Sequence, residues 1–125
     1  MQLINLEAES SLLSCMLKDN SLIKETQVQT KHFHDVANKT VFDALKKLDS
    51  KNEPIDIVTI ITEIRPENLN KIGGTQKLTL LESTNANLDN FKTYENYVIE
   101  AWKVREAKRL KETEISSLED IHLLT

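Results

Sequence analysis

The sequence predicts an all-α protein, and three features support this fold class. Only two glycines and two prolines occur in 125 residues, whereas a β-sandwich or barrel needs a turn signal about every 8–12 residues. Apolar side chains recur at helical spacing in several segments. The segment 89–111 contains no glycine or proline. Together these features predict a compact multi-helix core domain over residues 1–88, followed over 89–125 by a long helix that starts a helical hairpin.

Two helices are predicted in the first fifty residues. The first covers 7–18, because Glu7 and Glu9 fall in the first turn, where the helix dipole favours negative charge, and a leucine-rich face follows. The second covers 38–48, where four apolar residues mark one face of a 3.6-residue period: Val41, Phe42, Leu45 and Leu48.

The segment 55–64 fits two structures. Its β-branched residues alternate at Ile55, Ile57, Thr59 and Ile61 as in a strand. Ile57, Ile60, Ile61 and Ile64 fit a helical stripe equally well. Asp56 is a good N-cap, and Pro66 is expected to end the helix or strand that precedes it. We interpret the segment as a helix.

The only pair of glycines, Gly73 and Gly74, predicts a turn. Thr75 is expected to cap a short helix that continues to Leu81. The segment 83–90 is polar and typical of a turn.

The long helix is predicted to have two halves. Its first half carries apolar residues from Phe91 to Val104 on an arc wider than one small bundle face requires, which predicts contact with a second surface. Its second half, 103–111, is strongly basic. Further on, Ile115, Leu118, Ile121 and Leu124 recur in three-residue steps, as in an amphipathic segment or a helix cut short.

These patterns yield two groups of candidate residues. The candidates for an oligomer or partner interface are Tyr94, Tyr97, Val98, Ala101, Trp102, Arg105, Leu110, Ile115, Leu118 and Ile121. The basic run is either a solvated helix face or a contact for a nucleic-acid backbone or an acidic partner. Its candidate contacts are Lys103, Arg105, Lys108, Arg109 and Lys111.

No pattern in the sequence indicates catalysis. A Walker A loop needs a glycine-rich turn followed by Lys and Ser or Thr, whereas Gly74 is followed by Thr75-Gln76-Lys77-Leu78. His32 and His34 have too few companions for a zinc site, so we interpret them as loop residues that flank a core Phe33. There is no Gly-x-Ser-x-Gly nucleophile elbow. We therefore expect no catalytic residue, no bound cofactor and no metal in this chain.

Charge and cysteine content narrow the class of protein further. The formal net charge is −4, whereas a small protein that coats nucleic acid is usually basic. A single cysteine, Cys15, excludes an intrachain disulfide and favours a reducing compartment. No apolar stretch has the length of a membrane span or a signal peptide. We expect a cytoplasmic protein without membrane contacts.

Several short motifs, in order, resemble the N-terminal domain of DnaB-type replicative DNA helicases. Asn5-Leu6-Glu7-Ala8-Glu9 and Leu17-Lys18-Asp19-Asn20 are similar to the opening helix of that family and its exit. The other similar segments are Phe33 with Val41–Leu45, Pro54–Thr59, Gly73-Gly74 with Leu78 and Leu81, and Asn85, Tyr94, Val98 and Arg105. The sequence departs from the family at His32-Phe33-His34 and Asn38-Lys39, as in a divergent phage or plasmid copy.

The resemblance implies a compact helical domain followed by a helical hairpin. In the family, hairpins pair into dimers, and three dimers form a collar on a hexameric 5′-to-3′ motor that uses ATP and magnesium. Primase, and in some systems a loader, engages this end, and the parent acts on DNA. Ile115, Leu118 and Ile121 would then begin the return arm of the hairpin. The motor domain is absent from these residues.

Three hypotheses follow from the sequence. The first is a non-catalytic assembly and docking module of a replicative helicase. The second is a small helical nucleic-acid-binding protein that uses the basic run 103–111. The third is a free-standing protein that regulates a helicase by binding to it.

Overall fold

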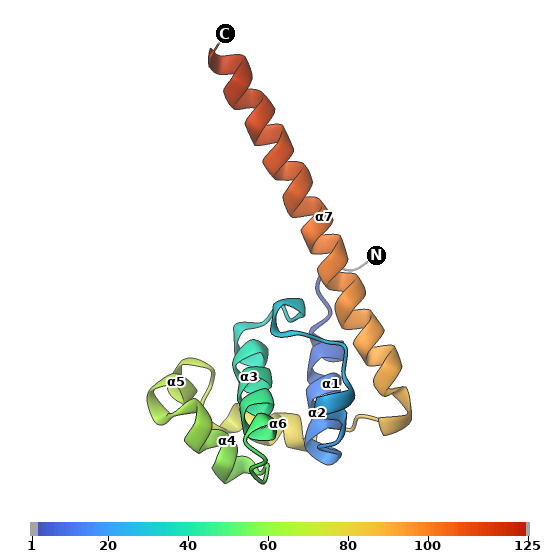
Figure 1. Ribbon diagram of the computed structural model, residues 1–125, viewed down its shortest axis with the longest axis vertical. Helices are drawn as coiled ribbons and strands as arrows, with labels where there is room; N and C mark the ends of the chain where they lie inside the picture. Colours follow the sequence, from blue (N-terminus) through green and yellow to red (C-terminus); the bar gives the residue numbers. More distant parts are fainter. Residues whose placement is uncertain (1–2, 125) are drawn as a thin grey trace.

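In the computed structural model, which describes residues 3–124 and the side chains of 3–116, a body of short helices carries one long helix that projects from it (Figure 1). The described residues contain helices and no strand, so the all-α prediction is confirmed. The helices are α1 (Leu6–Lys18), α2 (Leu22–Glu25), α3 (Val36–Ser50), α4 (Ile57–Ile64), α5 (Pro66–Lys71), α6 (Thr75–Ser83) and α7 (Phe91–Leu124), with 3₁₀ turns η1 (Thr30–His32) and η2 (Leu88–Asn90).

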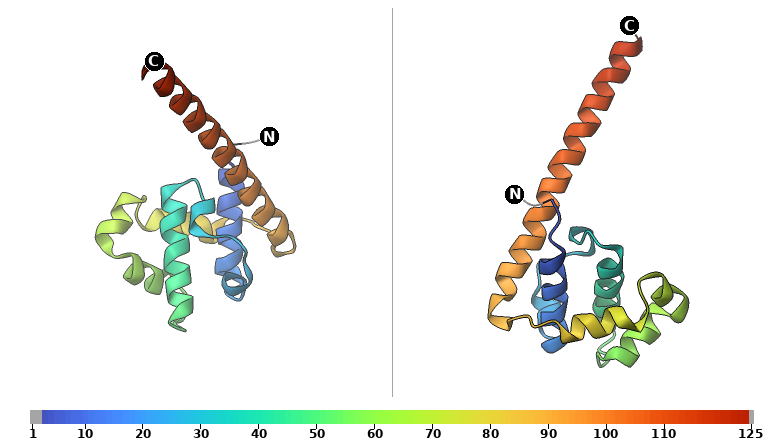
Figure 2. Two further views of the ribbon diagram at one scale, coloured as in Figure 1. Left: turned by 45° about the horizontal axis from the view of Figure 1, so that its top comes forward. Right: turned by 180° about the vertical axis from the view of Figure 1, so that it is seen from behind.

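The body is built around α1, which packs against α3, α6 and the first part of α7 (Figures 1 and 2). The α4–α5 pair covers the far side of α3. The core side chains come from all of these helices and from the turn before α3. The largest fully buried ones are Phe33, Phe42, Leu12, Leu13, Met16, Ile23, Leu45, Ile60, Leu78 and Leu81.

Side-chain caps explain where the main helices of the body begin. The Asn5 side chain accepts a hydrogen bond of 3.0 Å from the Ala8 N–H and starts α1. Asp35 caps α3, which is longer at both ends than the predicted 38–48. Asp56 and Thr59 form a reciprocal capping box at the start of α4, with bonds of 2.8 and 2.9 Å. The helical interpretation of 55–64 is therefore confirmed.

The turn between α5 and α6 is formed by the two glycines, as predicted. Gly73 and Gly74 have φ values of +102° and +67°, which favour residues without a Cβ. The expected capping role of Thr75 is wrong. Thr75 is the first residue of α6, Gly74 occupies the N-cap position, and no side chain caps this end. Helix α5 was not predicted, because it is short and begins at Pro66, whose fixed φ suits a first helical position.

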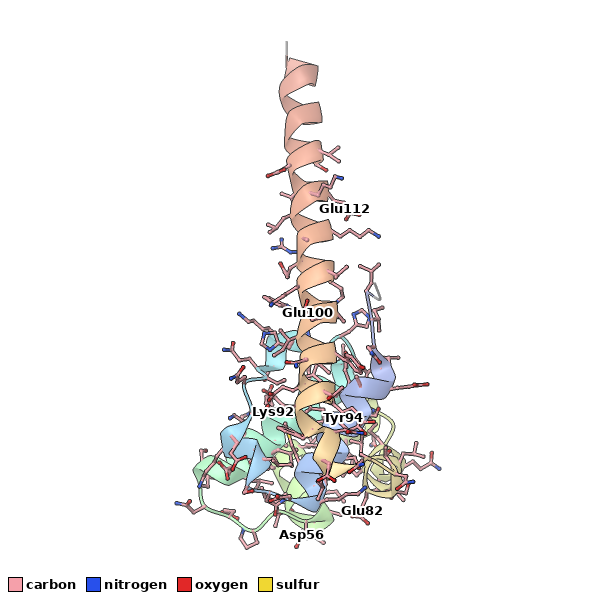
Figure 3. All side chains as sticks on the ribbon, turned by 90° about the vertical axis from the view of Figure 1, so that its right-hand side faces the viewer. Asp56, Glu82, Lys92, Tyr94, Glu100 and Glu112 are labelled. Atoms are coloured by element: carbon pink, nitrogen blue, oxygen red, sulfur yellow. The ribbon has the colours of Figure 1, made fainter. Side chains whose placement is uncertain are left out.

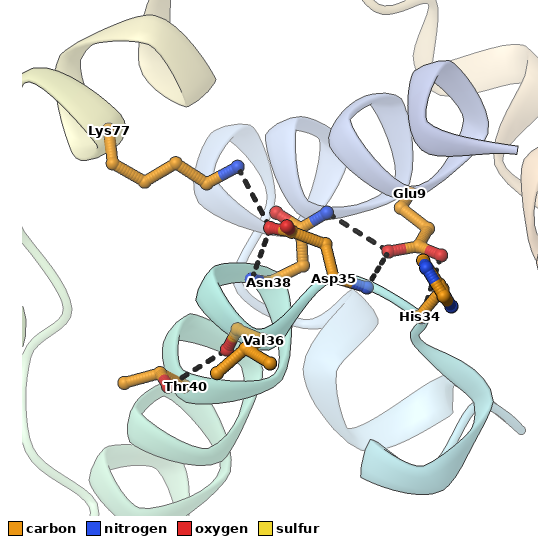
Figure 4. Close-up of polar contacts among 7 residues, drawn as sticks. All are labelled: Glu9, His34, Asp35, Val36, Asn38, Thr40 and Lys77. Atoms are coloured by element: carbon orange, nitrogen blue, oxygen red, sulfur yellow. Dashed lines mark hydrogen bonds and ion pairs between the residues drawn. The ribbon is translucent and has the colours of Figure 1, made fainter. Parts of the chain in front are cut away.

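A buried carboxylate ties α1 to the start of α3 (Figure 4). The Glu9 side chain is only 2% exposed. It accepts hydrogen bonds from the backbone N–H groups of His34 (2.8 Å) and Asp35 (3.3 Å) and from Nδ2 of Asn38 (3.0 Å). The Lys77 ammonium lies 3.7 Å from Asp35 and adds α6 to the same junction. These contacts fix the backbone turn that carries Phe33 into the core.

Candidate assembly surface on the long helix

Helix α7 consists of an inner section, which packs on the body, and an outer section, which extends beyond it (Figures 1 and 2). Figure 3 shows Lys92 and Tyr94 beside the body, Glu100 close to the level at which the helix leaves it, and Glu112 well beyond. We define the inner section as 91–105 and the outer section as 106–124. The helix is unbroken through Leu124.

The inner section buries one face against α1. Phe91, Val98 and Ala101 are each at most 4% exposed, so two of the interface candidates lie in the interior of the domain. Glu95 is buried on the same face, where its carboxylate accepts hydrogen bonds from the Thr26 hydroxyl (2.5 Å) and the Gln27 N–H (2.9 Å). No sequence motif marks this carboxylate as functional, although its position between Phe91 and Val98 places it on the apolar face.

The two tyrosine candidates differ in their exposure to solvent. Tyr94 is half-buried, and its hydroxyl accepts a hydrogen bond of 3.3 Å from the Asn87 N–H. Tyr97 is 54% exposed. Tyr97 is therefore available to a partner, whereas Tyr94 mainly supports the loop before α7.

Trp102 and Arg105 fasten α7 to the body where the helix leaves it. The Arg105 guanidinium donates hydrogen bonds to the carbonyl oxygens of Leu3 (2.8 Å) and His32 (2.9 Å). The half-buried Trp102 ring packs edge-on against His32 at 4.8 Å, with the Lys31 ammonium 4.9 Å from the ring centre. Arg105 therefore holds the N-terminal segment and the η1 turn to α7 at the point where the outer section begins.

The buried His32 corrects the expectation that both histidines are loop residues. His32 ends the η1 turn and is 7% exposed, whereas His34 is exposed. Its Nδ1 accepts a hydrogen bond of 2.9 Å from the Gln29 N–H. Burial lowers the pKa of His32 below the usual 6.5, and the charges of Lys31, Arg105 and Lys103 lower it further.

This lowered pKa predicts a pH-dependent stability. The neutral ring is favoured in the folded chain, so the contribution of His32 is complete above about pH 6.5 and is lost as the pH falls below it, where the unfolded chain binds the extra proton. The measurement is the urea midpoint at about pH 7.5 and about pH 5.5. His32→Gln should lose less stability than the wild type between these two conditions. An equal loss in both proteins would contradict the assignment.

The outer section exposes both apolar and basic side chains. Leu110 is 53% exposed and Ile115 is 48% exposed. Lys108, Arg109 and Lys111 are exposed as well, although Arg109 pairs with Glu106 at 2.9 Å. In the inner section, Lys103 pairs with Glu100 at 3.3 Å. Of the predicted basic contacts, Arg105 is thus already committed to the body, whereas the other four lie on the surface.

The exposed Leu110 and Ile115, and the apolar positions 118 and 121 beyond them, lie on the side of α7 opposite to the face that packs on the body. At about 100° per residue, positions 110, 115, 118 and 121 span roughly 140° of the helix circumference. The centre of this arc lies about 170° from the centre of the buried face that contains Phe91, Val98 and Ala101. The side chains of Leu118 and Ile121 lie outside those that the structure describes, and these two residues are placed by their helical positions alone.

The expected return arm is wrong for these residues. Ile115, Leu118 and Ile121 were predicted to begin the second arm of a hairpin, but α7 continues through them to Leu124 without a turn. No glycine or proline interrupts the segment, so the helix continues. The three-residue steps thus mark a side of the outgoing helix.

Comparisons with known proteins identify the family to which this architecture belongs. A family model for the DnaB-like helicase N-terminal domain matches residues 1–100. The chain belongs to this family. Its body and most of the inner section of α7 lie within the match, whereas the whole outer section lies beyond it.

Curated relatives place this DnaB-like domain within longer proteins. The replicative DNA helicase DnaB of Mycobacterium leprae (strain TN) is 33% identical over 99 residues, which are 77% of this chain and 16% of the relative. The replicative DNA helicase DnaB of Geobacillus stearothermophilus is 28% identical over 119 residues, which are 93% of this chain and 26% of the relative. The chain therefore corresponds to a small part of each helicase.

Solved structures show the same fold. The N-terminal domain of DnaB helicase from Mycobacterium tuberculosis superposes with a TM-score of 0.80 at 28% identity, over 95% of this chain and 90% of that one. A DnaB-like replicative helicase, described with its interactions with primase, also gives 0.80, at 27% identity over 92% of this chain and 28% of that one. Among the described residues of this DnaB-like domain, no helix has the length and apolar character to cross a membrane.

Proposed function

We propose that this chain is the non-catalytic assembly and docking domain of a hexameric replicative DNA helicase. Its family and its fold place it at the N-terminal part of such helicases. The observation that carries the proposal is the projecting section of α7, which presents uncovered apolar residues on the side that faces away from the body. ATP and magnesium would act in the motor part of the parent protein, which extends well beyond the region matched here.

Self-association through α7 would cover this apolar side. Leu110 and Ile115 are about half exposed on the outer section of α7, which extends beyond the body. A helix with an apolar arc gains stability when a second helix covers that arc. In a two-fold dimer each contact occurs twice, so one substitution removes two contacts. Two-fold pairing of α7 is the first step that we propose toward a hexamer.

The charge pattern of α7 favours an antiparallel pair. Residues 103–111 contain five basic side chains and one carboxylate, whereas residues 112–120 contain four carboxylates and no basic side chain. When two copies run antiparallel about a two-fold axis near Lys111 and Glu112, each basic segment lies opposite an acidic one. A parallel pair would place like charges side by side. Complementary charge therefore sets the orientation, and the acidic partner of the basic run is a second copy.

Docking of primase, and of a loader where one exists, is the second part of the proposed role. Support comes from the DnaB-like helicase that is described with its interactions with primase, because its fold covers 92% of this chain. The exposed Tyr97 and the unpaired sides of α7 offer the surface for such a partner. The parent helicase, rather than this domain, would supply the contact with DNA.

The experiment that tests assembly is sedimentation equilibrium of the purified chain over a concentration series. Ile115→Lys should weaken self-association by at least about tenfold, because it places two charges in the apolar contact of a two-fold pair. The matched control is Val58→Lys on α4, which changes an equally apolar residue that is 71% exposed on the body. Helicity measured by circular dichroism should remain the same in both variants.

Two outcomes would contradict the proposed assembly. One is an unchanged association constant in Ile115→Lys, and the other is an equal loss in Val58→Lys. A charge test is independent of both: Lys108→Glu and Lys111→Glu together should weaken pairing, and Glu112→Lys with Glu114→Lys should restore it. Restoration would not occur if the basic run instead served a nucleic acid, which would then bind the wild type and lose affinity steeply with salt.

A further inference from the structure

The body contains a small apolar pocket that the assembly surface does not use. It has a volume of about 180 Å³ and lies between the end of α1, the start of α4 and α6. Figure 3 shows two of its residues, Asp56 and Glu82, at the end of the body opposite to the projecting section of α7. No α7 residue with a described side chain lines it. The lining residues are Leu17, Lys18, Ile55, Asp56, Ile57, Ile60, Leu78 and Glu82.

The walls of the pocket are apolar. Ile60 and Leu78 are buried at its floor, and Leu17, Ile55 and Ile57 are half-buried around it. Pockets that hold drug-sized ligands usually measure about 300–1,000 Å³ and carry several converging polar groups. This pocket is smaller, and its charged lining residues, Lys18, Asp56 and Glu82, are exposed. Its size and lining suit one inserted apolar side chain.

The rim of the pocket carries excess negative charge. Asp56 and Glu82 are exposed, and neither takes part in an ion pair among the described side chains. One oxygen of Asp56 caps α4. The only cation at the pocket is Lys18, whose ammonium donates hydrogen bonds to the carbonyl oxygens of Thr84 (2.8 Å) and Ala86 (3.2 Å). Lys18 is therefore occupied, and the two carboxylates remain to meet a cation.

We propose that this pocket is a docking site for a partner protein, which inserts one apolar side chain flanked by lysines or arginines. Binding surfaces gain most of their affinity from an anchor residue buried in a pocket, and complementary charge at the rim adds specificity. The pocket offers both features. Because it lies away from the outer section of α7, a partner bound here leaves the assembly surface free, and both can be occupied in one particle.

The test uses nuclear magnetic resonance titration of the isotope-labelled full chain with a synthetic helical peptide that carries one leucine flanked by four lysines. The amide signals of Leu17, Ile57, Leu78 and Glu82 should shift with saturable binding. Replacing the peptide leucine by alanine should weaken binding by about tenfold, because it removes the buried anchor. Replacing the lysines by glutamates should abolish it.

Variants of the chain test the charged rim separately. Asp56→Asn with Glu82→Gln should weaken binding by about fivefold and reduce its salt dependence. Asparagine caps a helix as well as aspartate does, so α4 remains intact. The matched control is Asp19→Asn with Glu25→Gln, which removes two exposed carboxylates of the body that do not line the pocket and should leave the affinity unchanged.

Three results would overturn the proposal. The first is the absence of shifts at the pocket, and the second is equal affinity in the rim variant and its control. The third is a set of shifts at the same residues that depends on chain concentration without peptide, which would assign the pocket to a second copy. The self-association experiment reports on α7, so the failure of either proposal is distinguishable from that of the other.

Discussion

Phe33→Ala should lower the free energy of unfolding of the chain by about 4 kcal/mol, which is a large fraction of the stability of a domain of this size. The ring is 1% exposed and packs on Phe42 with ring centres 5.0 Å apart. Its removal leaves a cavity under the turn between η1 and α3, and the backbone of that turn is held by Glu9 and cannot collapse freely. The measurement is the free energy of unfolding from urea denaturation followed by circular dichroism.

Two further substitutions in this turn test whether the loss of stability comes from the Phe33 ring or from any change in the turn. Phe33→Leu should cost about 1–2 kcal/mol, because most of the apolar volume remains. His34→Ala should stay within about 0.5 kcal/mol, because that side chain is exposed. A loss in Phe33→Ala no larger than in His34→Ala would mean that the ring does not carry the packing assigned to it.

The fold could be predicted largely from local patterns. The face of Val41, Phe42, Leu45 and Leu48 is buried as the 3.6-residue period indicates. Asp56 decided between helix and strand for 55–64, because a capping residue carries directional information that β-branched content lacks. Helix α5 was not predicted, because a helix of six residues is too short for its apolar residues to show the 3.6-residue period.

The candidate surface could be predicted only in part. The apolar arc of α7 is visible in the sequence, but its division into a body-facing side and an uncovered side depends on where α1 lies. The sequence pattern alone therefore could not show that Val98 and Ala101 are buried whereas Tyr97 is exposed. The contacts of Arg105 with two backbone carbonyls, and the buried role of His32, also depend on segments that are distant in sequence.

The second large effect is expected at Glu9, where Glu9→Ala should cost about 3 kcal/mol. The substitution removes the acceptor for the N–H groups of His34 and Asp35 and for the amide of Asn38, and buried donors without an acceptor are costly. The oxygen Oδ1 of Asn38 has no hydrogen-bond partner among the described residues, so Asn38 is already incompletely satisfied and would lose the bond from its Nδ2 as well.

Glutamine distinguishes the hydrogen bonds from the packing of the side chain. Glu9→Gln keeps the size but turns an NH₂ group toward at least one of these donors, so it should cost about 2 kcal/mol rather than nothing. Glu7→Ala, two residues earlier on the exposed side of α1, should cost less than about 1 kcal/mol and serves as the control. If Glu9→Gln were as stable as the wild type, the Glu9 side chain would contribute through its packing and not through the hydrogen bonds of its carboxylate. If it loses stability as expected, the hydrogen bonds that the Glu9 carboxylate accepts from His34, Asp35 and Asn38 hold the turn that carries Phe33 into the core.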